Sequence, residues 1–500
     1  MTRTLSLLLF VASFPALAAA QTPAEEPPRP PPPPAEATPP PPPASVDLEA
    51  VLHGEGRGLT AADAARLAID TAPGVERAEA ARRLASAGAL RALNGFIPQL
   101  TLSARYTRLS EIQNGSVGGS LDSDQIEAIT AGVDDPDARF LWQQTLTSLS
   151  QPFPILLNNF AFQARLTVPL SDMLLQVLPA YESAQAREEA AELQVAAQRR
   201  EVGLSARESF YQYARARASL AVAQSSLAQA ETRHRQVEAF VEAGTAARVD
   251  ELRIRAQLAA ARVAVVRAEA GVRLAAAGVR TLLHLEPNTE IAVGEDLLAP
   301  MPSVQGDIEQ LVSQALTQRD DVRAIRRLIE AAGRAADAAE GSRYPHLLLQ
   351  GNVDISNPNQ RVFPQTEEFR ESWDVSAILQ WSPSDVVTGE AQASEARAQQ
   401  DQARADLRQL QDGIRITVTE AATNYQATNE ALSAARLGVE AADESYRVTM
   451  ERYNAGAATV SDTIDASSEQ IRAQLDLVNA AIDARIAHAR LQRAVGASEE

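Results

Sequence analysis

The chain of 500 residues contains no cysteine, and its 65 acidic and 46 basic residues give a formal net charge of −19. The lack of cysteine excludes disulfides and thiolate chemistry. The acidic balance argues against a nucleic-acid partner, because nucleic-acid binding selects basic surfaces.

The N-terminus indicates export. In residues 1–20, Arg3 precedes an apolar run at 5–11 and then small residues, which is the pattern of a secretory signal peptide. Residues 21–57 are predicted to be a disordered, Pro-rich tether, because thirteen prolines at 22–43 favour an extended chain without a core. A spacer is the favoured interpretation of this tether, and a periplasmic docking strand is the alternative. Beyond the signal, no apolar run of about 18 residues predicts a transmembrane helix.

The rest of the chain reads as a tandem duplication. One register, a shift of 247 residues, aligns the first parts of the two copies, and a shift of 212 aligns their later parts. The aligned pairs include Val75 with Val322, Pro98 with Pro345, Tyr213 with Tyr425, Gly244 with Gly456, and Asp250 with Asp462. The change of register places an insertion at about 110–160 in the first copy. We therefore predict a first repeat at 58–300, a second at 301–495 and a C-terminal tail at 496–500.

Each copy has the same predicted order of elements. A helix of about 35 residues is followed by two strand-like segments, a helix of about 70 residues, a Gly-containing turn and another helix of about 35. The predicted helices are 60–95, 172–241 and 250–284 in the first copy, and 307–343, 386–453 and 462–495 in the second. Laid end to end, the two short helices match the long one, which at 1.5 Å per residue gives a wall roughly 100 Å high. A tube can use helices of this length, whereas a compact globule cannot.

The long helices carry larger side chains every seven residues, with alanine over much of the remaining surface. These positions are Tyr213, Leu220, Leu227, His234 and Val241 in the first copy, and Tyr425, Leu432, Val439, Tyr446 and Tyr453 in the second. This spacing predicts long coiled-coil contacts. An ordinary two-stranded coiled coil remains the alternative to a helical barrel.

Four segments alternate between apolar and polar side chains. They are 99–107, 163–171, 346–355 and 374–382, each nine or ten residues long. This length suits a tilted strand that spans a membrane. Alternation alone fits a half-buried soluble sheet equally well. The chain offers no second layer to cover the apolar faces, which favours lipid as their partner.

Four strands cannot close a barrel, and open edges are not tolerated in hydrocarbon. Several chains must therefore contribute to one barrel. Two chains would give eight strands with a filled interior, whereas three would give twelve, the smallest set expected to leave a lumen. We expect a trimer, with the loops 110–160 and 357–373 outside the cell.

No enzyme is predicted. The histidines lack metal-ligand spacing: His53, His234, His284, His346 and His488. No phosphate-binding Gly-rich loop and no nucleophile elbow is found in the sequence, so neither a metal nor a cofactor is expected.

Four passages carry a family resemblance. They are LTAADAARLAIDTAPGVERAEA, FIPQLTLSARYTR, VEAGTAARVDEL and YNAGAATVSDTIDA. In this order, and within a duplicated chain, they resemble the TolC-like outer-membrane efflux protein family. The resemblance implies a mainly α protein whose homotrimer forms a twelve-stranded β-barrel continuous with a periplasmic α-helical barrel. It implies an outer-membrane exit duct of a tripartite efflux or type I secretion system, working passively with a periplasmic adaptor and an inner-membrane pump. A periplasmic coiled-coil scaffold is the alternative, and the transported substrate stays open.

The resemblance also implies a gate at the helical tips. Asp462 and Asp465 match acidic residues that ring the periplasmic aperture, where crowding raises some pKa values and attracts cations. Asp250 and Tyr453 match partners in the bonds that hold the inner coiled coil shut. The family's arginine in this tether is replaced by Ala458, which puts the strength of the closed latch in doubt. For Tyr453, a role as the last of the seven-residue positions is the alternative.

Three other residues complete the predicted tips. Arg248 on the opposing tip is a candidate to replace the missing arginine. Gly244 and Gly456 match turns that adaptors grip in the family, and ending a helix in a left-handed conformation is a role compatible with that. For Asp250 and Asp462 the alternative role is N-capping of the helices that they begin.

Overall fold

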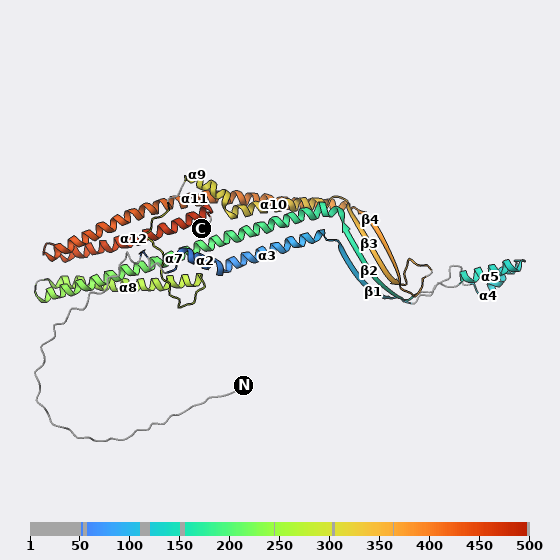
Figure 1. The fold of residues 1–500 in the computed structure, drawn as a ribbon, viewed down its shortest axis with the longest axis horizontal. Helices are drawn as coiled ribbons and strands as arrows, with labels where there is room; N and C mark the ends of the chain where they lie inside the picture. The colour runs from blue at the N-terminus through green and yellow to red at the C-terminus, as the bar shows by residue number, and fades with distance from the viewer. Residues whose placement is uncertain are drawn as a thin grey trace, which may run out of the picture. The chain divides into compact units, whose positions relative to one another are not determined.

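The structure is a computed structural model that describes residues 52–53, 58–110, 121–150, 156–244, 246–302, 306–363 and 365–497. The predicted signal peptide 1–20, most of the tether 21–57 and the end of the tail lie outside these residues. All described residues belong to one compact unit. Long α-helices make up most of it (Figure 1), so the prediction of a mainly helical chain is confirmed. Among the described helices, none combines the length and the apolar character needed to cross a membrane.

The first half of the chain contains helices on both sides of two strands. In order, its elements are α2 (Ala61–Thr71), α3 (Pro73–Leu93), the 3₁₀ turn η1 (Asn94–Phe96), β1 (Gln99–Arg108), α4 (Ser123–Thr130), α5 (Pro136–Ser150), β2 (Asn158–Pro169), α6 (Leu170–Asp172), the π-helical turn η2 (Met173–Val177), α7 (Leu178–Glu242) and α8 (Arg248–Leu282).

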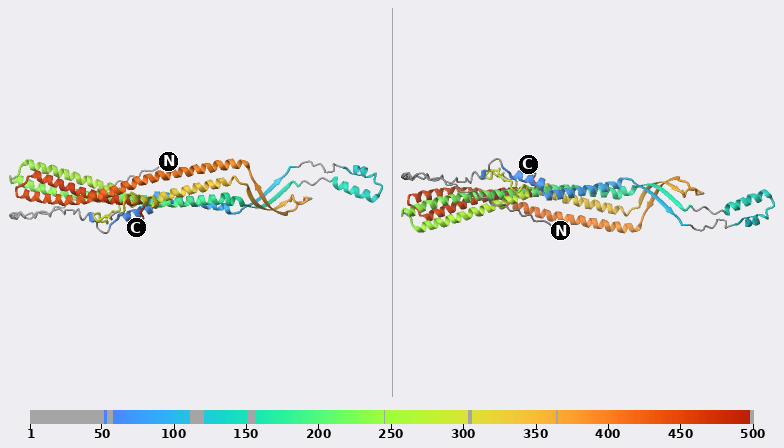
Figure 2. Two further views of the ribbon diagram at one scale, coloured as in Figure 1. Left: turned by 90° about the horizontal axis from the view of Figure 1, so that it is seen from above. Right: turned by 90° about the horizontal axis from the view of Figure 1, so that it is seen from below.

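The second half repeats this order without the insertion between its strands. Its elements are α9 (Ile308–Gln318), α10 (Asp320–Gly341), β3 (His346–Asn357), β4 (Arg370–Gln380), α11 (Pro383–Asn454) and α12 (Val460–Val495). The helix α7 contacts α3, α8, α10 and α12, and α11 contacts α10 and α12. The α7–α8 hairpin therefore lies beside the α11–α12 hairpin (Figure 2), and the sheet lies at the opposite end of the helices from the hairpin turns (Figure 1).

Two predicted helices are each broken in two. The predicted helix 60–95 breaks at Ala72, which has an extended backbone (φ −70°, ψ 125°) because the following Pro73 disfavours the helical conformation before it. The predicted helix 307–343 breaks at the equivalent Arg319 (φ −63°, ψ 132°) without a proline. The sequence carries no local signal for this second break, because side-chain contacts from distant helices hold it.

Other predicted boundaries were also wrong. The strand predicted at 163–171 begins at Asn158 and ends at Pro169, because residues 170–172 start a helical turn. The strand predicted at 374–382 runs instead from Arg370 to Gln380. The predicted loop 110–160 contains the helices α4 and α5, which pack on each other. A capping box of Asp122 and Gln125 begins α4.

The four strands form one antiparallel sheet in the order β1-β2-β3-β4. Its register places side chains of one kind opposite each other. One row joins Leu102, Ala164, Val353 and Trp373, and the neighbouring row joins Thr101, Arg165, Asn352 and Asp374. The sheet therefore has one apolar and one polar face, as the alternation predicted.

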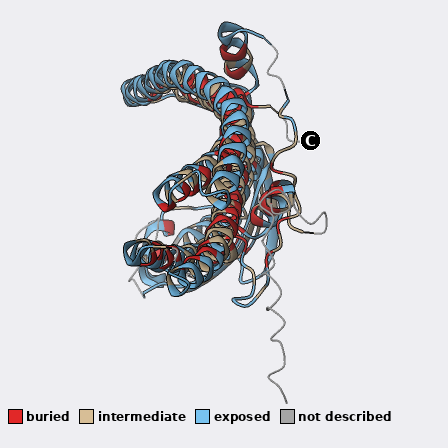
Figure 3. Ribbon diagram, turned by 90° about the vertical axis from the view of Figure 1, so that its left-hand side faces the viewer, coloured by how far each residue is buried: buried red, intermediate tan, exposed pale blue. Residues whose placement is uncertain are grey.

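The core lies between the helices, where buried residues face neighbouring helices and exposed residues lie on both outer sides (Figure 3). All ten positions of the predicted seven-residue spacing are buried or half-buried, which confirms the helix face that this spacing indicated. Two of them do more than pack. The Tyr213 hydroxyl donates to the Ile291 carbonyl at 2.6 Å, and the Tyr425 hydroxyl donates to the Pro302 carbonyl at 2.6 Å. These equivalent tyrosines fasten the segment that connects the two halves.

Close packing at Gly341 predicts a test of the fold. A Cβ at this buried end of α10 would lie 2.1 Å from the Leu175 carbonyl oxygen in the π-helical turn. We expect Gly341→Ala to cost about 1–3 kcal/mol, because α10 must move away from that turn. Thermal unfolding followed by circular dichroism measures the effect. Gly278→Ala is the control, since a Cβ at this exposed position of α8 meets nothing within 4 Å. A Gly341→Ala protein that unfolds no earlier than the native one would contradict this packing.

Candidate functional site

The two hairpin turns at the helical tips are built on glycines with left-handed backbones. Gly244 has φ 76° and Gly456 has φ 73°. The Gly456 N–H donates to the Tyr453 carbonyl at 2.9 Å, and the Ala457 N–H donates to the Arg452 carbonyl at 2.7 Å, which is a Schellman ending of α11. A Cβ at either glycine would meet nothing within 4 Å, so backbone conformation rather than crowding favours glycine here. The predicted helix-ending role is confirmed, and adaptor docking stays a prediction.

Asp462 begins α12 as part of a capping box with Thr459. Its Oδ2 accepts from the Thr459 N–H at 2.7 Å and from the Thr459 hydroxyl at 2.8 Å. The bond from the Thr459 N–H, followed in size by the bond from the Thr459 hydroxyl, holds the pKa of the Asp462 carboxyl below its usual value. Within one chain this shift is opposite to the rise expected from crowding. Asp465 lies one turn further along and is exposed. Their aperture role stays a prediction.

Neither aspartate occupies the N-cap position of its helix, although Asp462 takes part in capping. Thr459 is the N-cap of α12, and Ala247 is the N-cap of α8 without a side-chain bond. Asp462 and Asp250 are each the third residue of their helix. Asp462 still completes the cap of α12 from that position, whereas Asp250 does not cap α8.

The predicted tether residues lie close together. Tyr453 is half-buried against a small cluster that includes Ile254 and Val460. Burial, and then the negative charge of Asp250, raise the pKa of the Tyr453 hydroxyl. In the described part of the chain no hydrogen bond joins the two side chains, and Asp250 Oδ1 lies 3.7 Å from Arg253 Nη1. The tether role stays a prediction.

Arg248, the candidate to replace the family's arginine, is engaged elsewhere. Its Nη1 forms an ion pair with Glu251 on the same helix. Glu251 is buried and Arg248 is exposed. In this conformation Arg248 therefore stabilises the first turn of α8, and it forms no bond to the α11–α12 tip among the described residues.

Arg233, which no sequence pattern singled out, is a buried arginine of α7 that contacts both helices of the opposite hairpin. Only 4% of its surface is exposed. Its Nη2 donates to the Tyr446 hydroxyl on α11 at 2.7 Å, and its Nη1 donates to the Thr463 carbonyl on α12 at 3.4 Å. The guanidinium carbon also lies 5.6 Å from the centre of the Tyr446 ring, within range of a cation–π contact. No carboxylate of the described residues pairs with it.

This arrangement makes Arg233 a contact between the two hairpins beside the predicted tether. Burying a charge without an opposite charge costs free energy. The neutral partners of Arg233 therefore stabilise this contact less than a carboxylate would. An arginine in a helix is ordinarily solvated, and therefore its type gave no sign of burial. The only sequence feature that pointed to this contact was its partner Tyr446, because the seven-residue spacing predicted that Tyr446 faces the neighbouring helices.

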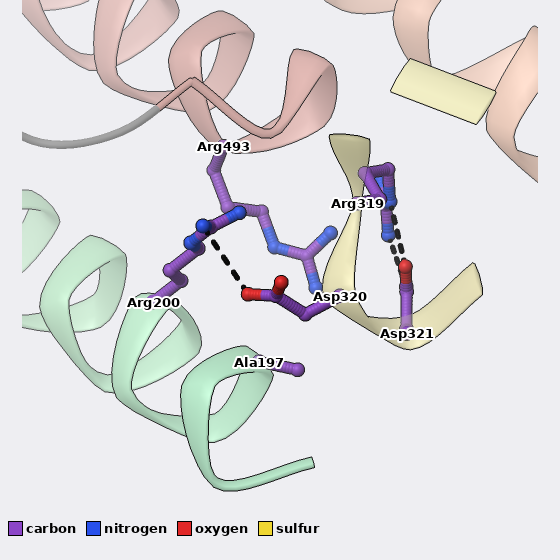
Figure 4. A pocket seen from close by; sticks show the side chains of 6 residues that line it. All are labelled: Ala197, Arg200, Arg319, Asp320, Asp321 and Arg493. Carbon is purple, nitrogen blue, oxygen red and sulfur yellow. Dashed lines mark hydrogen bonds and ion pairs between the residues drawn. The ribbon is translucent and has the colours of Figure 1, made fainter. Parts of the chain in front are cut away.

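A second charged cluster lies further along the helices, where α7, the start of α10 and the end of α12 meet (Figure 4). The carboxylate of the buried Asp320 lies 3.2 Å from Arg200 Nη2. Arg319 Nη2 donates to Asp321 Oδ2 at 2.6 Å, and Arg319 Nη1 donates to the Ala494 carbonyl at 3.2 Å. The space among these residues is about 20 Å³, room for a single water. The cluster therefore joins helices and does not hold a ligand.

The cluster predicts a pH-dependent contribution to stability. Burial raises the pKa of Asp321, but the bond to Arg319 and its charge outweigh burial and leave the pKa below 3.8. The ionised carboxylate thus stabilises the folded chain above the unfolded pKa of about 3.9, and this contribution disappears as the pH falls through the lower folded value.

We expect Asp321→Asn to cost about 1 kcal/mol at pH 7 and less at about pH 3, where part of the contribution of the carboxylate is lost. Thermal unfolding at both pH values measures the difference. Asp337→Asn, an exposed position on the same helix, is the control and should change neither temperature. If Asp321→Asn lowered the unfolding temperature equally at both pH values, the charge of Asp321 would not be the source of the stabilisation.

The described residues contain no group of three or more potential metal-ligating side chains. The tips of the described chain consist of turns, caps and contacts between hairpins.

Comparisons with known proteins identify the family. The model of the outer membrane efflux protein family matches residues 64–283 and 311–497, one match in each half of the chain. The outer membrane efflux protein BepC of Brucella suis is 24% identical over 320 residues, which are 61% of this chain and 67% of that protein.

Solved structures show the same fold. The outer-membrane channel OprN superposes with a TM-score of 0.66 at 19% identity, covering 90% of this chain and 96% of that one. The outer membrane protein VceC of Vibrio cholerae superposes with a TM-score of 0.66 at 17% identity, covering 87% of this chain and 95% of that one. The chain belongs to the outer membrane efflux protein family, the TolC-like family that its sequence resembles.

Proposed function

We propose that this chain is the exit duct of a tripartite efflux or type I secretion system. Three copies form a twelve-stranded barrel in the outer membrane, and their helices continue it as a long barrel in the periplasm. A periplasmic adaptor grips the helical tips and couples the duct to an inner-membrane pump. The duct itself does no chemistry, as is general for this family of channels.

The observation that carries this proposal is the exposed apolar face of the sheet. Leu102 is 73% exposed, Trp373 72% and Val375 74%. Nothing in the described part of the chain covers them. Leaving apolar surface in water costs about 25 cal/mol per Å². Lipid removes this cost, whereas the alternative of a water-soluble coiled-coil scaffold would retain it.

Aromatic side chains flank the apolar face at both ends, as in the girdles of membrane barrels. Toward the end far from the helices lie Tyr106, Phe160, Phe369 and Trp373, and at the helix end lie Tyr344 and Trp381. The rings of Tyr106 and Phe160 are 4.8 Å apart, and those of Phe160 and Phe369 are 6.1 Å apart. From Trp373 to Trp381 the chain extends about 26 Å, which at a tilt of about 35–45° covers roughly 20 Å of an apolar band about 25 Å tall. This spacing supports a membrane-spanning sheet.

The sheet has two free edges, because β1 and β4 each have a strand on one side only. Unpaired backbone groups are not tolerated in hydrocarbon, so the edges must pair with other copies. With three copies, the polar face encloses a lumen wide enough to conduct.

At the other end, Asp462 and Asp465 of three copies place six carboxylates around the periplasmic aperture. Asp250 and Tyr453, with Arg233, hold the two hairpins of each copy together in the closed state. The turns at Gly244 and Gly456 are the surface that the adaptor grips. Opening separates the hairpins and widens the ring of carboxylates.

Substitutions on the two faces of β1 test the membrane assignment. We expect Leu102→Arg to prevent assembly in the outer membrane, since an arginine facing lipid costs up to about 2–4 kcal/mol. The adjacent Ser103→Arg, which introduces the same side chain on the polar face, should assemble. Membrane fractionation and electrophoresis without heating measure the assembled protein. Equal behaviour of the two variants, or native protein that is soluble without detergent, would reject the duct.

The acidic aperture makes a second prediction. In planar bilayers, the double variant Asp462→Ala with Asp465→Ala should weaken block of the current by divalent cations about tenfold, because the ring that attracts cations is removed. Glu242→Ala, an exposed position at the end of α7, is the control and should leave block unchanged. Unchanged block in the double variant would remove both aspartates from the aperture.

A further inference from the structure

The polar face of the sheet carries more arginine than acid. Its charged residues are Arg105, Arg165, Arg370 and, from the β3–β4 turn, Arg361, against Asp354 and Asp374. On the apolar face, the register places charges only at the end far from the helices, at Arg108 and Glu371. The positive surplus therefore belongs to the polar face.

A hydrogen-bonded row crosses this face from β2 to β4. Arg165 Nε donates to Asn352 Oδ1 at 3.0 Å, and Asn352 Nδ2 donates to Asp374 Oδ2 at 2.8 Å. Arg361 Nη2 donates to the other oxygen of the same carboxylate at 2.6 Å. Two arginines thus share one aspartate, and the row keeps a net positive charge.

Arg105 adds a second positive charge. It is exposed, and it lines an open hollow of about 500 Å³ with Arg361 and Asp354, beside the turn that follows β3. No carboxylate of the described residues forms an ion pair with it. The carboxylate of Asp354 accepts instead from the Ser356 hydroxyl at 3.0 Å, but its negative charge offsets one arginine, so the face keeps a surplus of one positive charge per chain. Arg370 does not add to the surplus, because it pairs with Glu368 at 2.7 Å.

We propose that Arg105 and Arg165 make the barrel section of the duct selective for anions, favouring cargo that bears carboxylate or phosphate groups. This inference rests on the proposed function, in which the polar face lines the lumen and each charge occurs three times around it. Walls of low dielectric focus such charges on a narrow aqueous path. Guanidinium groups also match carboxylates and phosphates with paired hydrogen bonds.

The selectivity of the barrel is opposite to that of the proposed acidic aperture. The two sites lie at opposite ends of α7 and α11, so their fields are separated by many Debye lengths at ordinary salt. An anion that the pump has forced past the aperture meets a favourable field in the barrel. The last section of the duct thus discriminates among solutes independently of the tips.

The absence of cysteine from the chain allows the charge to be changed in an assembled channel. Arg105→Cys and Arg165→Cys are each reconstituted in planar bilayers, and the reversal potential is measured across a tenfold KCl gradient. The same channel is then treated with a trimethylammonium-bearing or a sulfonate-bearing methanethiosulfonate. Arg108→Cys is the matched control, on the same strand as Arg105 but with the parity of the apolar face.

We expect each lumenal cysteine to lower the chloride-to-potassium permeability ratio about twofold, the cationic reagent to restore it, and the anionic reagent to lower it further. The changes should fade toward 1 M salt, where the Debye length is about 3 Å. The Arg108→Cys channel should keep the native ratio with and without reagent. Lumenal variants that conduct with unchanged ratios, or an equal change at Arg108, would overturn the inference while leaving the duct intact. Native protein that does not conduct would overturn the duct itself, and the inference with it.

Discussion

The sheet of this protein exposes an apolar face and two unpaired edges, and nothing else in the described chain can satisfy either. Leu102, Val353 and Trp373 lie in one row across it without a covering layer. Apolar surface is stabilised by removal from water, whereas the backbone groups of an open edge need hydrogen-bond partners. Lipid can cover the face, and only further strands can close the edges. The proposed duct follows from meeting both demands together, since copies that close the edges also turn the polar face inward.

The helices of the two halves pack in the same way, because the two halves repeat the same pattern of alanines and larger side chains. Alanines allow α7 and α11 to approach their neighbours, while the equivalent Tyr213 and Tyr425 fasten the connecting segment through their hydroxyls. The two halves reach one geometry by different chemistry where their first helices break. Pro73 breaks the first by local sterics, whereas the charged cluster around Arg319 and Asp320 holds the second break. Duplication has kept the shape and changed the interactions that maintain it.

At the tips, the bonds within each hairpin are more numerous than the contacts between the two hairpins. The glycine turns and the capping box of Asp462 define each hairpin by short-range bonds. Between the hairpins lie half-buried Tyr453 beside Asp250, and Arg233 with neutral partners. Hairpins with many internal bonds and few bonds to each other are suited to move as units. The proposed gate requires this property.

The sequence alone determined the features that depend on periodicity. A seven-residue spacing of large side chains indicated the buried stripe of α7 and α11, and alternation indicated the four strands with their faces, because both patterns are written in neighbouring residues. It also indicated the glycine turns and, through resemblance, the family. The tertiary structure alone decided the break at Arg319, the pairing of Arg248 with Glu251 and the burial of Arg233. Long polar side chains are soluble by default, and only the helix that happens to lie opposite determines whether they are solvated, paired or enclosed.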